Sequence, residues 1–552
     1  MRNLFILLFA VFCTKVNAQA PVWEWAQGIG GSDSESEPAV ASDKDGNVFL
    51  SGNFFSTTLT FGSTTLTNDS AGIPDMFLVK MDNSSNVLWA TSAGGNDQDR
   101  AFSVAVDADG NCYVAGSFKS PSITFGTTTL TNASSGYDCF IVKYDADGNV
   151  LWAMRAGGGS NDFPKHIVAD ASGIYIAGYY YSPTITFGSV TLTNTGSPDL
   201  FVVKLDTSGN GLWGQSVNGG TFGSEIPVSF VSDGAGNCYV ACRASYGTSV
   251  IAGTDTFTYG AKGCGLVIKY NTAGNLSWST QLDPAAWVYP AGLAVDVADN
   301  TLYLTGTFGD TSFTFAGTTL SNPITEPKVF LAKFAGDGNE LWAKSVTSDH
   351  DEVGIASVVV DATGNCFVMG SFATYPIAIG SDTFQNAGED DIYMAKLNSN
   401  GDVLWAESIG GVDYESPVFI TADAHGNIYA TGQYRSTSLD FGTASVSSAG
   451  MGDIFLAKLA PGTTGINAAE SNNEIRIFPN PTSGEFYVQG TKFNADDEVK
   501  IFNLLGKEVY FTQIPASTSN IRIQISNMVT GVHFVRVETE NQIRIERLII
   551  QH

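Results

Sequence analysis

The chain has 552 residues, of which 15% are charged and 12% aromatic, and its net charge is −28. This composition excludes a long coiled coil and a largely disordered chain, and it favours many short strands joined by turns. Because the negative charge repels phosphate backbones, nucleic acid is excluded as a partner. Cations, cationic proteins and neutral glycans stay open, and solubility outside the cell explains the charge equally well.

The N-terminus has the features of a secretory signal peptide. Arg2 and Lys15 flank an apolar run, and Val16-Asn17-Ala18 offers small residues for cleavage, which predicts a signal peptide over residues 1–18. The run is too short to span a bilayer, and no later stretch is long and apolar enough. We therefore expect an exported mature chain without a transmembrane segment.

Seven tryptophan-centred signatures recur at intervals of 61–65 residues, at Trp25, Trp89, Trp152, Trp213, Trp278, Trp342 and Trp405. A constant period of this size indicates a repeat architecture. The second repeat shows four strand-like segments, at residues 101–107, 112–118, 139–144 and 150–160. Asp-Gly and Gly-Asn turns separate them, which is typical of antiparallel hairpins. An insert at residues 123–132 predicts a further small hairpin at the edge of the sheet.

The repeats predict a seven-bladed β-propeller over residues 19–460, since closing four-stranded sheets into a ring protects their edges. The aspartate that opens the first turn occurs once in each of seven repeats, from Asp43 in the first to Asp423 in the last. The lysine that ends the third strand also occurs seven times, from Lys80 to Lys458. The first tryptophan strand precedes the first full repeat, and the last repeat lacks one. We therefore expect the N-terminal strand to close the ring. The repeated lysine is interpreted as a blade-to-blade ion pair with the repeated aspartate.

A different composition begins after the repeats. Residues 461–474 are rich in Gly, Thr, Ala and Asn and predict a linker. Residues 475–552 carry eight acidic and eight basic residues and short alternating strands. They predict a small C-terminal β-sandwich.

This last domain resembles the C-terminal sorting domain of proteins exported by type IX secretion in Gram-negative bacteria. The resemblance rests on Phe478, Pro479, Asn480, Pro481, Gly484, Gly506 and Gly531, with the segments around them and the terminal Arg547-Leu548-Ile549-Ile550. His533 stands where that family usually has an aromatic residue. The resemblance implies recognition by the type IX secretion machinery, passage through the periplasm, and release from or attachment to the outer cell surface.

The repeats resemble the bacterial seven-bladed propellers of the SBBP-repeat type. The pattern that carries this resemblance runs from Val104 to Gly116, in the order Val-Ala-Val-Asp-Ala-Asp-Gly-Asn-Cys-Tyr-Val-Ala-Gly. Propellers serve many functions, so the resemblance implies an architecture and no activity.

An acidic loop after each tryptophan strand is the leading candidate for a ligand site. Its carboxylates are Asp33, Glu35, Asp97, Asp99, Asp162, Glu225, Asp351, Glu352, Asp413 and Glu415. On one propeller face they would focus a negative potential and suit a basic ligand or a hard cation, which leaves calcium open as a bound ion. The alternative is that they are solvated turn residues. Trp287 lies outside the repeat pattern and suits either stacking on a sugar ring or local packing.

Six cysteines remain after the signal peptide, and their spacing supports neither zinc nor a disulfide framework. Cys112, Cys238 and Cys366 occupy one repeat position and are expected as small buried hydrophobes. A bridge between Cys242 and Cys264 is left open.

Catalysis has little support in the sequence, because the histidines are scattered and no nucleophile or phosphate motif occurs. The Asp-x-Asp-Gly-Asn turns lack the length and the final Glu of calcium loops and are expected as hairpin turns. We expect a secreted or surface-attached binding or adhesion module without a cofactor, whose ligand is a glycan, a surface protein or a cation-bridged polymer. The alternatives are a polysaccharide-processing enzyme using paired carboxylates and a structural protein of an extracellular layer.

Overall fold

The computed structural model describes residues 22–460, apart from 221–222, 324–325 and 348–352, and most of residues 476–550. The chain divides into two compact units, Met1–Gly462 and Thr463–His552, which are treated separately. All regular elements among the described residues are β-strands, which confirms the all-β class. The predicted signal peptide and linker lie outside the described residues. Within the described chain we find no helix that meets the length and hydropathy of a membrane span.

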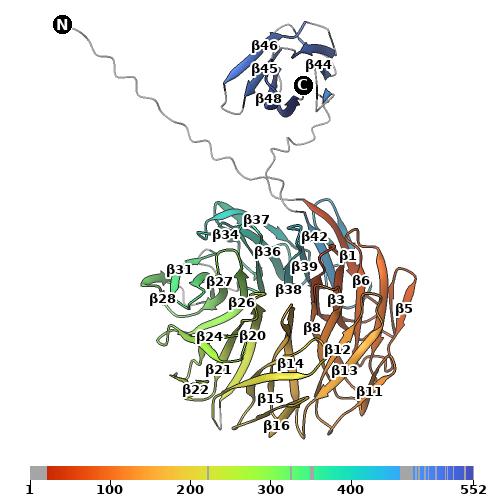
Figure 1. The fold of residues 1–552 in the computed structure, drawn as a ribbon, viewed down its shortest axis with the longest axis vertical. Coiled ribbons are helices and arrows are strands. Elements are labelled where there is room, and N and C mark those ends of the chain that lie inside the picture. Colours follow the sequence, from red (N-terminus) through yellow and green to blue (C-terminus); the bar gives the residue numbers. More distant parts are fainter. Residues whose placement is uncertain are drawn as a thin grey trace, which may run out of the picture. The chain divides into compact units, whose positions relative to one another are not determined.

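The first unit contains seven sheets built on the same four-strand order, which follow one another around a ring (Figure 1). The first strands are β2 (Glu35–Ser42), β8 (Asp99–Val106), β14 (Asp162–Asp170), β20 (Ser224–Ser232), β26 (Val288–Asp296), β32 (Ser357–Val360) and β38 (Glu415–Ala422). The second strands are β3 (Val48–Phe54), β9 (Cys112–Phe118), β15 (Gly173–Tyr180), β21 (Cys238–Ser245), β27 (Thr301–Phe308), β33 (Cys366–Ala373) and β39 (Ile428–Tyr434).

The outer half of each sheet consists of a fully buried third strand and a tryptophan-bearing fourth strand. The third strands are β6 (Asp75–Met81), β12 (Asp138–Tyr144), β18 (Asp199–Leu205), β24 (Cys264–Tyr270), β30 (Lys328–Ala335), β36 (Asp390–Leu397) and β42 (Asp453–Leu459). The fourth strands are β7 (Val87–Ala93), β13 (Val150–Ala156), β19 (Gly211–Asn218), β25 (Leu276–Leu282), β31 (Glu340–Ser345), β37 (Val403–Ile409) and β1 (Trp23–Ile29).

The first strands line the axis of the ring. Each contacts the first strand of the next sheet, and β38 contacts β2. They surround a cavity of about 740 Å³ whose lining is mainly small and apolar, including Val104, Val168, Val231 and Val295. Strands buried on both faces read as continuous apolar runs, which is the pattern of the second and third strands.

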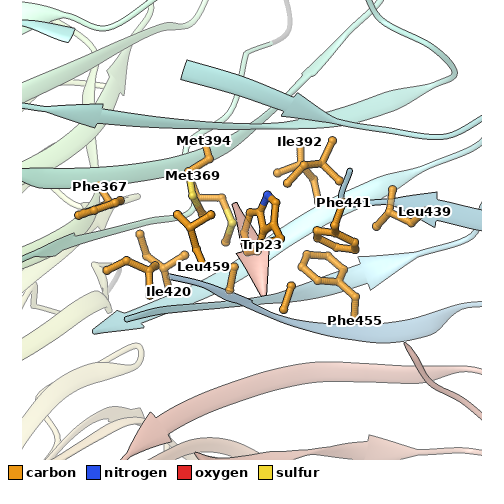
Figure 2. Packing of buried hydrophobic residues seen from close by; sticks show 14 of the residues in the cluster. Trp23, Phe367, Met369, Ile392, Met394, Ile420, Leu439, Phe441, Phe455 and Leu459 are labelled. Atoms are coloured by element: carbon orange, nitrogen blue, oxygen red, sulfur yellow. The ribbon is translucent and has the colours of Figure 1, made fainter. Parts of the chain in front are cut away.

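The N-terminal strand β1 pairs with β42 of the last sheet, in the order β1-β42-β39-β38. Trp23 is 3% exposed and packs with Phe441 of the small hairpin in the last repeat, at 5.2 Å between ring centroids, and with Met394 of the preceding sheet (Figure 2). Its indole N–H donates to Glu407 Oε1 at 3.0 Å. The strand therefore joins the first described residues to the last two sheets through a buried aromatic side chain.

The turn after each first strand is a hairpin turn, as the sequence predicts. In the second sheet, Asp107 Oδ1 accepts the backbone N–H groups of Asp109 and Asn111, and Gly110 has a φ of +81°. A side chain that caps its own turn in this way explains the Asp-x-Asp-Gly-Asn pattern without a metal ion.

Small two-stranded hairpins lie between the second and third strands, as the insert at residues 123–132 predicts. They are β4 (Thr58–Phe61) with β5 (Thr64–Thr67), β10 (Ser122–Phe125) with β11 (Thr128–Thr131), β16 (Thr184–Phe187) with β17 (Val190–Thr193), β22 (Ser249–Ala252) with β23 (Asp255–Thr258), β28 (Ser312–Phe315) with β29 (Thr318–Ser321), β34 (Ile377–Ile379) with β35 (Asp382–Phe384), and β40 (Ser438–Asp440) with β41 (Ser445–Ser447). The β22–β23 pair extends the preceding sheet to six strands.

The prediction that the repeated lysine forms an ion pair with an aspartate of the neighbouring blade is wrong, because the aspartate it meets belongs to its own sheet. Lys80 lies 3.7 Å from Asp43, which belongs to the same sheet. Across the junction, Lys80 Nζ and the Trp89 indole both donate to the carbonyl oxygen of Ala146, at 3.2 and 3.0 Å. The link between neighbouring sheets is thus a backbone carbonyl of the next turn, and the aspartate neutralises the lysine within its own sheet.

The second unit packs two antiparallel sheets around one core, as predicted for a β-sandwich. One sheet contains β43 (Arg476–Phe478), β44 (Glu485–Gln489) and β47 (Asn520–Gln524). The other contains β45 (Glu498–Asn503), β46 (Glu508–Gln513), β48 (Gly531–Glu538) and β49 (Ile543–Ile550). Phe486 and Ile523 of the first sheet share a buried cluster with Val499, Ile501 and Val535 of the second.

Candidate functional site

Half of the predicted acidic-loop carboxylates are inaccessible to solvent. The side chains at the start of five first strands are 0% exposed, namely Glu35, Asp99, Asp162, Glu225 and Glu415. The expectation that these residues line an acidic surface is therefore wrong. The loops do cross one end of the ring, but they fold these side chains inward between neighbouring sheets.

Each of these buried carboxyls faces a second one from the preceding sheet. The partner is the aspartate five residues before the repeated lysine. Burial raises the pKa of the first-strand member, and the charge of the partner carboxyl raises it further. We call these five sets the junction carboxyl pairs: Asp453–Glu35, Asp75–Asp99, Asp138–Asp162, Asp199–Glu225 and Asp391–Glu415. A backbone hydrogen bond accompanies four of them, as from Asp99 N to Pro74 O at 2.9 Å.

The Gly-Gly sequence of each loop is required by the pair beneath it. A Cβ added to Gly94 would lie 2.0 Å from Asp75 Oδ1, and one added to Gly95 would lie 2.5 Å from Ser120 Oγ. The same first glycine covers an aspartate at Gly30, Gly157 and Gly410. The loop thus seals the pair from water, and only glycine permits so close an approach.

A serine at the end of the second strand supplies the main hydrogen bond to the pair. Ser120 Oγ donates to Asp99 Oδ2 at 2.7 Å, and Ser56 donates to Glu35 at the same distance. Burial nevertheless raises the pKa of Glu35 and Asp99 to about 7, and that of Asp162 to about 6. Loss of hydration disfavours the charged form, so these acids release their protons closer to neutral pH than ordinary carboxyls do.

Glu225 is the least compensated member. Tyr246 stands where the sheets of the other four pairs have the serine, so Glu225 lacks the hydroxyl hydrogen bond that Ser56, Ser120 and Ser182 donate elsewhere. Burial and the charge of Asp199 raise its pKa to about 8.

The other predicted site residues are distributed differently. Asp33, Asp97 and Asp413 are partly exposed, and Asp97 forms an ion pair with Lys119 at 3.2 Å. Asp351 and Glu352 lie outside the described residues. Trp287 is half-buried, lies over Gly309 and meets Tyr289 edge to face at 5.0 Å, which fits local packing. Whether any of these residues binds a ligand stays a prediction.

No metal centre emerges from the described part of the chain, where no group of three or more His, Cys, Asp or Glu side chains is suitably placed. Calcium binding stays a prediction. Cys242 and Cys264 are both buried free thiols, as are Cys112, Cys139, Cys238 and Cys366. Burial raises the pKa of the Cys264 thiol to about 12, so it is unreactive.

The same end of the ring exposes a set of residues that the sequence reasoning missed. We call it the loop face: the loops after the fourth strands, the starts of the first and third strands and the ends of the second. Its basic side chains lie over aromatic rings, with Arg243 at 3.7 Å from the Tyr289 centroid and Lys165 at 4.0 Å from that of Phe102. Tyr181 and Tyr246 are 45% and 86% exposed there.

The signal for this face was the spacing of the bases. In a chain with 27 basic residues, the loop face holds Arg100, Lys119, Lys165, Arg243, Lys262 and Arg435. Each lies within a few residues of a strand end on that side. The junction carboxyl pairs are buried, whereas Asp33, Asp97 and Asp413 stay partly exposed, so the accessible face carries basic and aromatic side chains beside a few carboxylates.

In the second unit, Gly531 opens β48 with a φ of +142°, which favours glycine. Phe478 ends β43. Pro479, Asn480, Pro481, Gly484 and Gly506 lie outside the described residues. The sequence of this unit is recognised by a family model.

Residues 476–551 match the secretion system C-terminal sorting domain. The match indicates export by type IX secretion to the cell surface or the extracellular space and an interaction with that secretion machinery. It covers the second unit only.

The relatives of the repeats are distant. The chain is 23% identical over 512 residues to an uncharacterized WD repeat-containing protein of Acanthamoeba polyphaga mimivirus, covering 76% of this chain and 36% of that protein. It is 26% identical over 378 residues to the regulatory protein FlaEY of Caulobacter vibrioides, covering 64% and 38%. The chain thus spans little more than a third of the length of either relative.

Solved structures with similar folds include the WD40 β-propeller domain of Doa1, at a TM-score of 0.38 and 9% identity, covering 78% of this chain and 94% of that one. A protein of unknown function from Dyadobacter fermentans has a TM-score of 0.34 and 11% identity, with coverages of 66% and 97%. The first unit is a β-propeller. These similarities carry no information about activity.

Proposed function

We propose that the protein is a secreted or surface-attached binding module, a seven-bladed propeller of the SBBP type that is exported by type IX secretion and recognises a glycan or a surface protein. The seven repeated sheets, the ordered contacts of their first strands and the β1–β42 pairing support the blade count and the closure. The sorting domain supports the route of export.

The observation that carries the binding proposal is the loop face. Aromatic rings there share the surface with basic side chains, as in the contacts from Phe163 to Tyr179 and from Tyr179 to Tyr181, at 5.2 and 6.1 Å between centroids. Exposed aromatic and arginine side chains are the residues enriched in recognition sites. The chain concentrates them at one end, although it is acidic throughout.

Binding is a better reading of this end than polysaccharide cleavage by paired carboxylates. A catalytic carboxyl must contact the glycosidic oxygen or the anomeric carbon. The junction carboxyl pairs are 0–2% exposed and are covered by the Gly-Gly loops, so a sugar chain has no access to them.

The test is a binding screen of the purified chain against a glycan panel and against isolated cell surfaces. We expect saturable binding that falls when Phe163 and Tyr289 on the loop face are both changed to Ser. The matched control is Lys44→Gln, an exposed change at the opposite end of the first sheet, which should leave binding unchanged. Equal binding by the unchanged protein, the double variant and the control would contradict the proposal that the loop face binds the ligand.

The export step is tested separately. Removal of residues 475–552 should leave the propeller in the periplasm, because the sorting domain is lost. Surface display of the truncated chain would contradict this assignment.

A further inference from the structure

A pocket of about 340 Å³ lies on the loop face where the last sheet meets the first and second sheets. It is lined by Ser34, Ser36, Glu37, Phe55, Arg100, Tyr414, Gln433, Tyr434, Arg435 and Gly452. Two guanidinium groups, one carboxylate, hydroxyl groups and aromatic rings thus converge on one hollow. A few polar groups fixed around a concave site are the usual composition of a ligand pocket.

Arg100 has a donor without an acceptor. Its Nη2 donates to Gln98 Oε1 at 3.1 Å and its Nη1 lies 3.4 Å from Glu37 Oε2. Its Nε is buried and has no hydrogen-bond partner, and the same holds for Ser36 Oγ. Since unpaired buried polar atoms are costly and rare, two in one pocket lining point to a bound acceptor.

Glu37 is held in an unusual backbone conformation. Its φ is +52° within β2, and the pairing with β3 passes from Ser36 to Ala39 without it. Asn53 Nδ2 donates to Glu37 Oε2 at 2.8 Å, and Asn53 Oδ1 accepts the N–H of Ala101. Asn53 of the adjacent strand β3, itself held by Ala101 of the neighbouring sheet, therefore fixes the Glu37 carboxylate beside Arg100, and backbone strain of the kind seen at Glu37 concentrates at functional sites.

Arg435 provides the second cation. Its side chain is exposed and lies 5.5 Å from the Tyr414 ring centroid. It forms no ion pair with any described carboxylate, although the whole chain carries a net charge of −28. An arginine stacked on an aromatic ring keeps its planar donor edge available for a carboxylate.

We propose that this pocket binds a carboxylate-bearing sugar, a uronate unit of an acidic polysaccharide. Arg100 and Arg435 receive the carboxylate, Tyr414 and Phe55 contact the sugar ring, and the pocket hydroxyl groups and Glu37 exchange hydrogen bonds with the ring hydroxyls. Glu37 disfavours a dianionic phosphate beside Arg100 by repulsion, and it gives the ring hydroxyls an acceptor. The assignment rests on the proposed function as a binding module.

The test is calorimetric titration of the mature chain with tetragalacturonate and with its fully methyl-esterified form, which keeps the ring and removes the charge. We expect the ester to bind more weakly by about ten-fold or more, because charge-assisted hydrogen bonds are lost. Arg100→Gln and Arg435→Gln should each weaken tetragalacturonate binding by about the same factor. If Arg100→Gln lowers the melting temperature, its affinity also reflects lost stability, and the affinity of the Arg435→Gln variant decides the test.

The control variant is Lys44→Gln, which removes an exposed basic side chain at the opposite end of the first sheet, outside the pocket and outside the loop face. It should bind as the unchanged protein does. Equal affinity for acid and ester, equal loss in Lys44→Gln, binding of a peptide carboxylate instead, or no binding of tetragalacturonate would overturn the pocket assignment. Glycan or cell-surface binding that ignores both pocket arginines would do so while leaving the proposed function intact.

Discussion

Two kinds of junction join the sheets of the propeller. Among the described residues, five junctions hold a pair of buried carboxyls and two hold none. At the two exceptions the third-strand aspartate is replaced by Cys264 and Lys328, and the first-strand acid by Val288 and Val353. Both members are replaced together at each exception, which indicates that the two carboxyls act as one unit.

The residues around the pair change with it. Where the pair is absent, the Gly-Gly sequence is absent too, and Asp310 and Thr374 occupy the serine position. The junction with Glu225 is intermediate, since it keeps both acids and the glycines but has no serine. The serine and the glycines therefore accompany the buried pair for physical reasons. The serine donates a hydrogen bond to the pair, and the glycines leave room for it.

The largest effect is expected from filling the space above a pair. Gly94→Ala places a Cβ 2.0 Å from the Asp75 carboxylate, which is 2% exposed and cannot move aside. We expect the free energy of unfolding to fall by about 3 kcal/mol, as for severe overpacking. Gly159→Ala is the control, because a Cβ there meets no atom within 4 Å. Calorimetric melting measures the stability of both variants. Equal losses of stability would contradict the conclusion that the Gly-Gly loop packs directly on the carboxyl pair.

The pH dependence of stability should be the reverse of ordinary acid denaturation. Burial raises the pKa of Asp75 and Asp162 to about 6 and that of Glu35 and Asp99 to about 7. The folded chain therefore holds protons that the unfolded chain releases near pH 4, so stability falls as pH rises from about 4 to about 8. We expect the melting temperature to drop by several degrees between pH 5 and pH 8. A rise over this window would show that the pairs are ionised.

Glu225 provides a sharper version of this test. Its pKa rises from 4.5 to about 8, so the unchanged protein should lose stability as pH rises through this window, whereas Glu225→Gln should not and should be the more stable of the two at pH 9. At pH 5 the variant should match the unchanged protein. Glu35→Gln is the contrast, since both Glu35 oxygens accept hydrogen bonds, from Ser56 and Gly31, and an amide nitrogen cannot. Glu35→Gln should destabilise the protein at both pH values. Identical pH profiles of stability for the two variants would contradict the conclusion that Glu225 is less well compensated than Glu35.

The smallest effect concerns the serine. Ser120→Ala removes a 2.7 Å hydrogen bond to Asp99 and should lower the free energy of unfolding by about 1 kcal/mol. The loss should grow above pH 7, because Asp99 then resembles Glu225. Tyr246→Ala at the intermediate junction is the control, since Tyr246 is 86% exposed. A similar loss of stability in Ser120→Ala and Tyr246→Ala would show that the effect comes from changing the loop and not from losing the serine hydroxyl.

The local periodicities of the chain predicted most of the fold. The tryptophan period, the apolar alternation and the Asp-Gly turns each depend on residues within one hairpin, so they could be read before any contact was known. The pairing of β1 with β42 also followed, because one tryptophan strand was left over before the first repeat and one was missing from the last. The sorting domain was recognisable from a short motif around Phe478 and Gly531.

The candidate site was predicted less well. Asp97 and Asp99 stand two residues apart in one loop, yet one is partly exposed and the other is 0% exposed. Only the Gly-Gly sequence hinted that the loop folds over something, and it does not identify what lies beneath. The aspartate that pairs with Asp99 comes from another sheet, 24 positions earlier.

By itself, the sequence determined that the chain is an exported, acidic, all-β repeat protein with a separate sorting domain, because composition and short-range pattern suffice for these conclusions. Only the tertiary structure decided which charges reach the solvent. Packing of one sheet against the next buries the junction carboxyl pairs and leaves arginine, lysine and aromatic side chains on the loop face beside a few partly exposed aspartates. Burial depends on contacts between residues far apart in the chain, and a one-dimensional pattern does not record them.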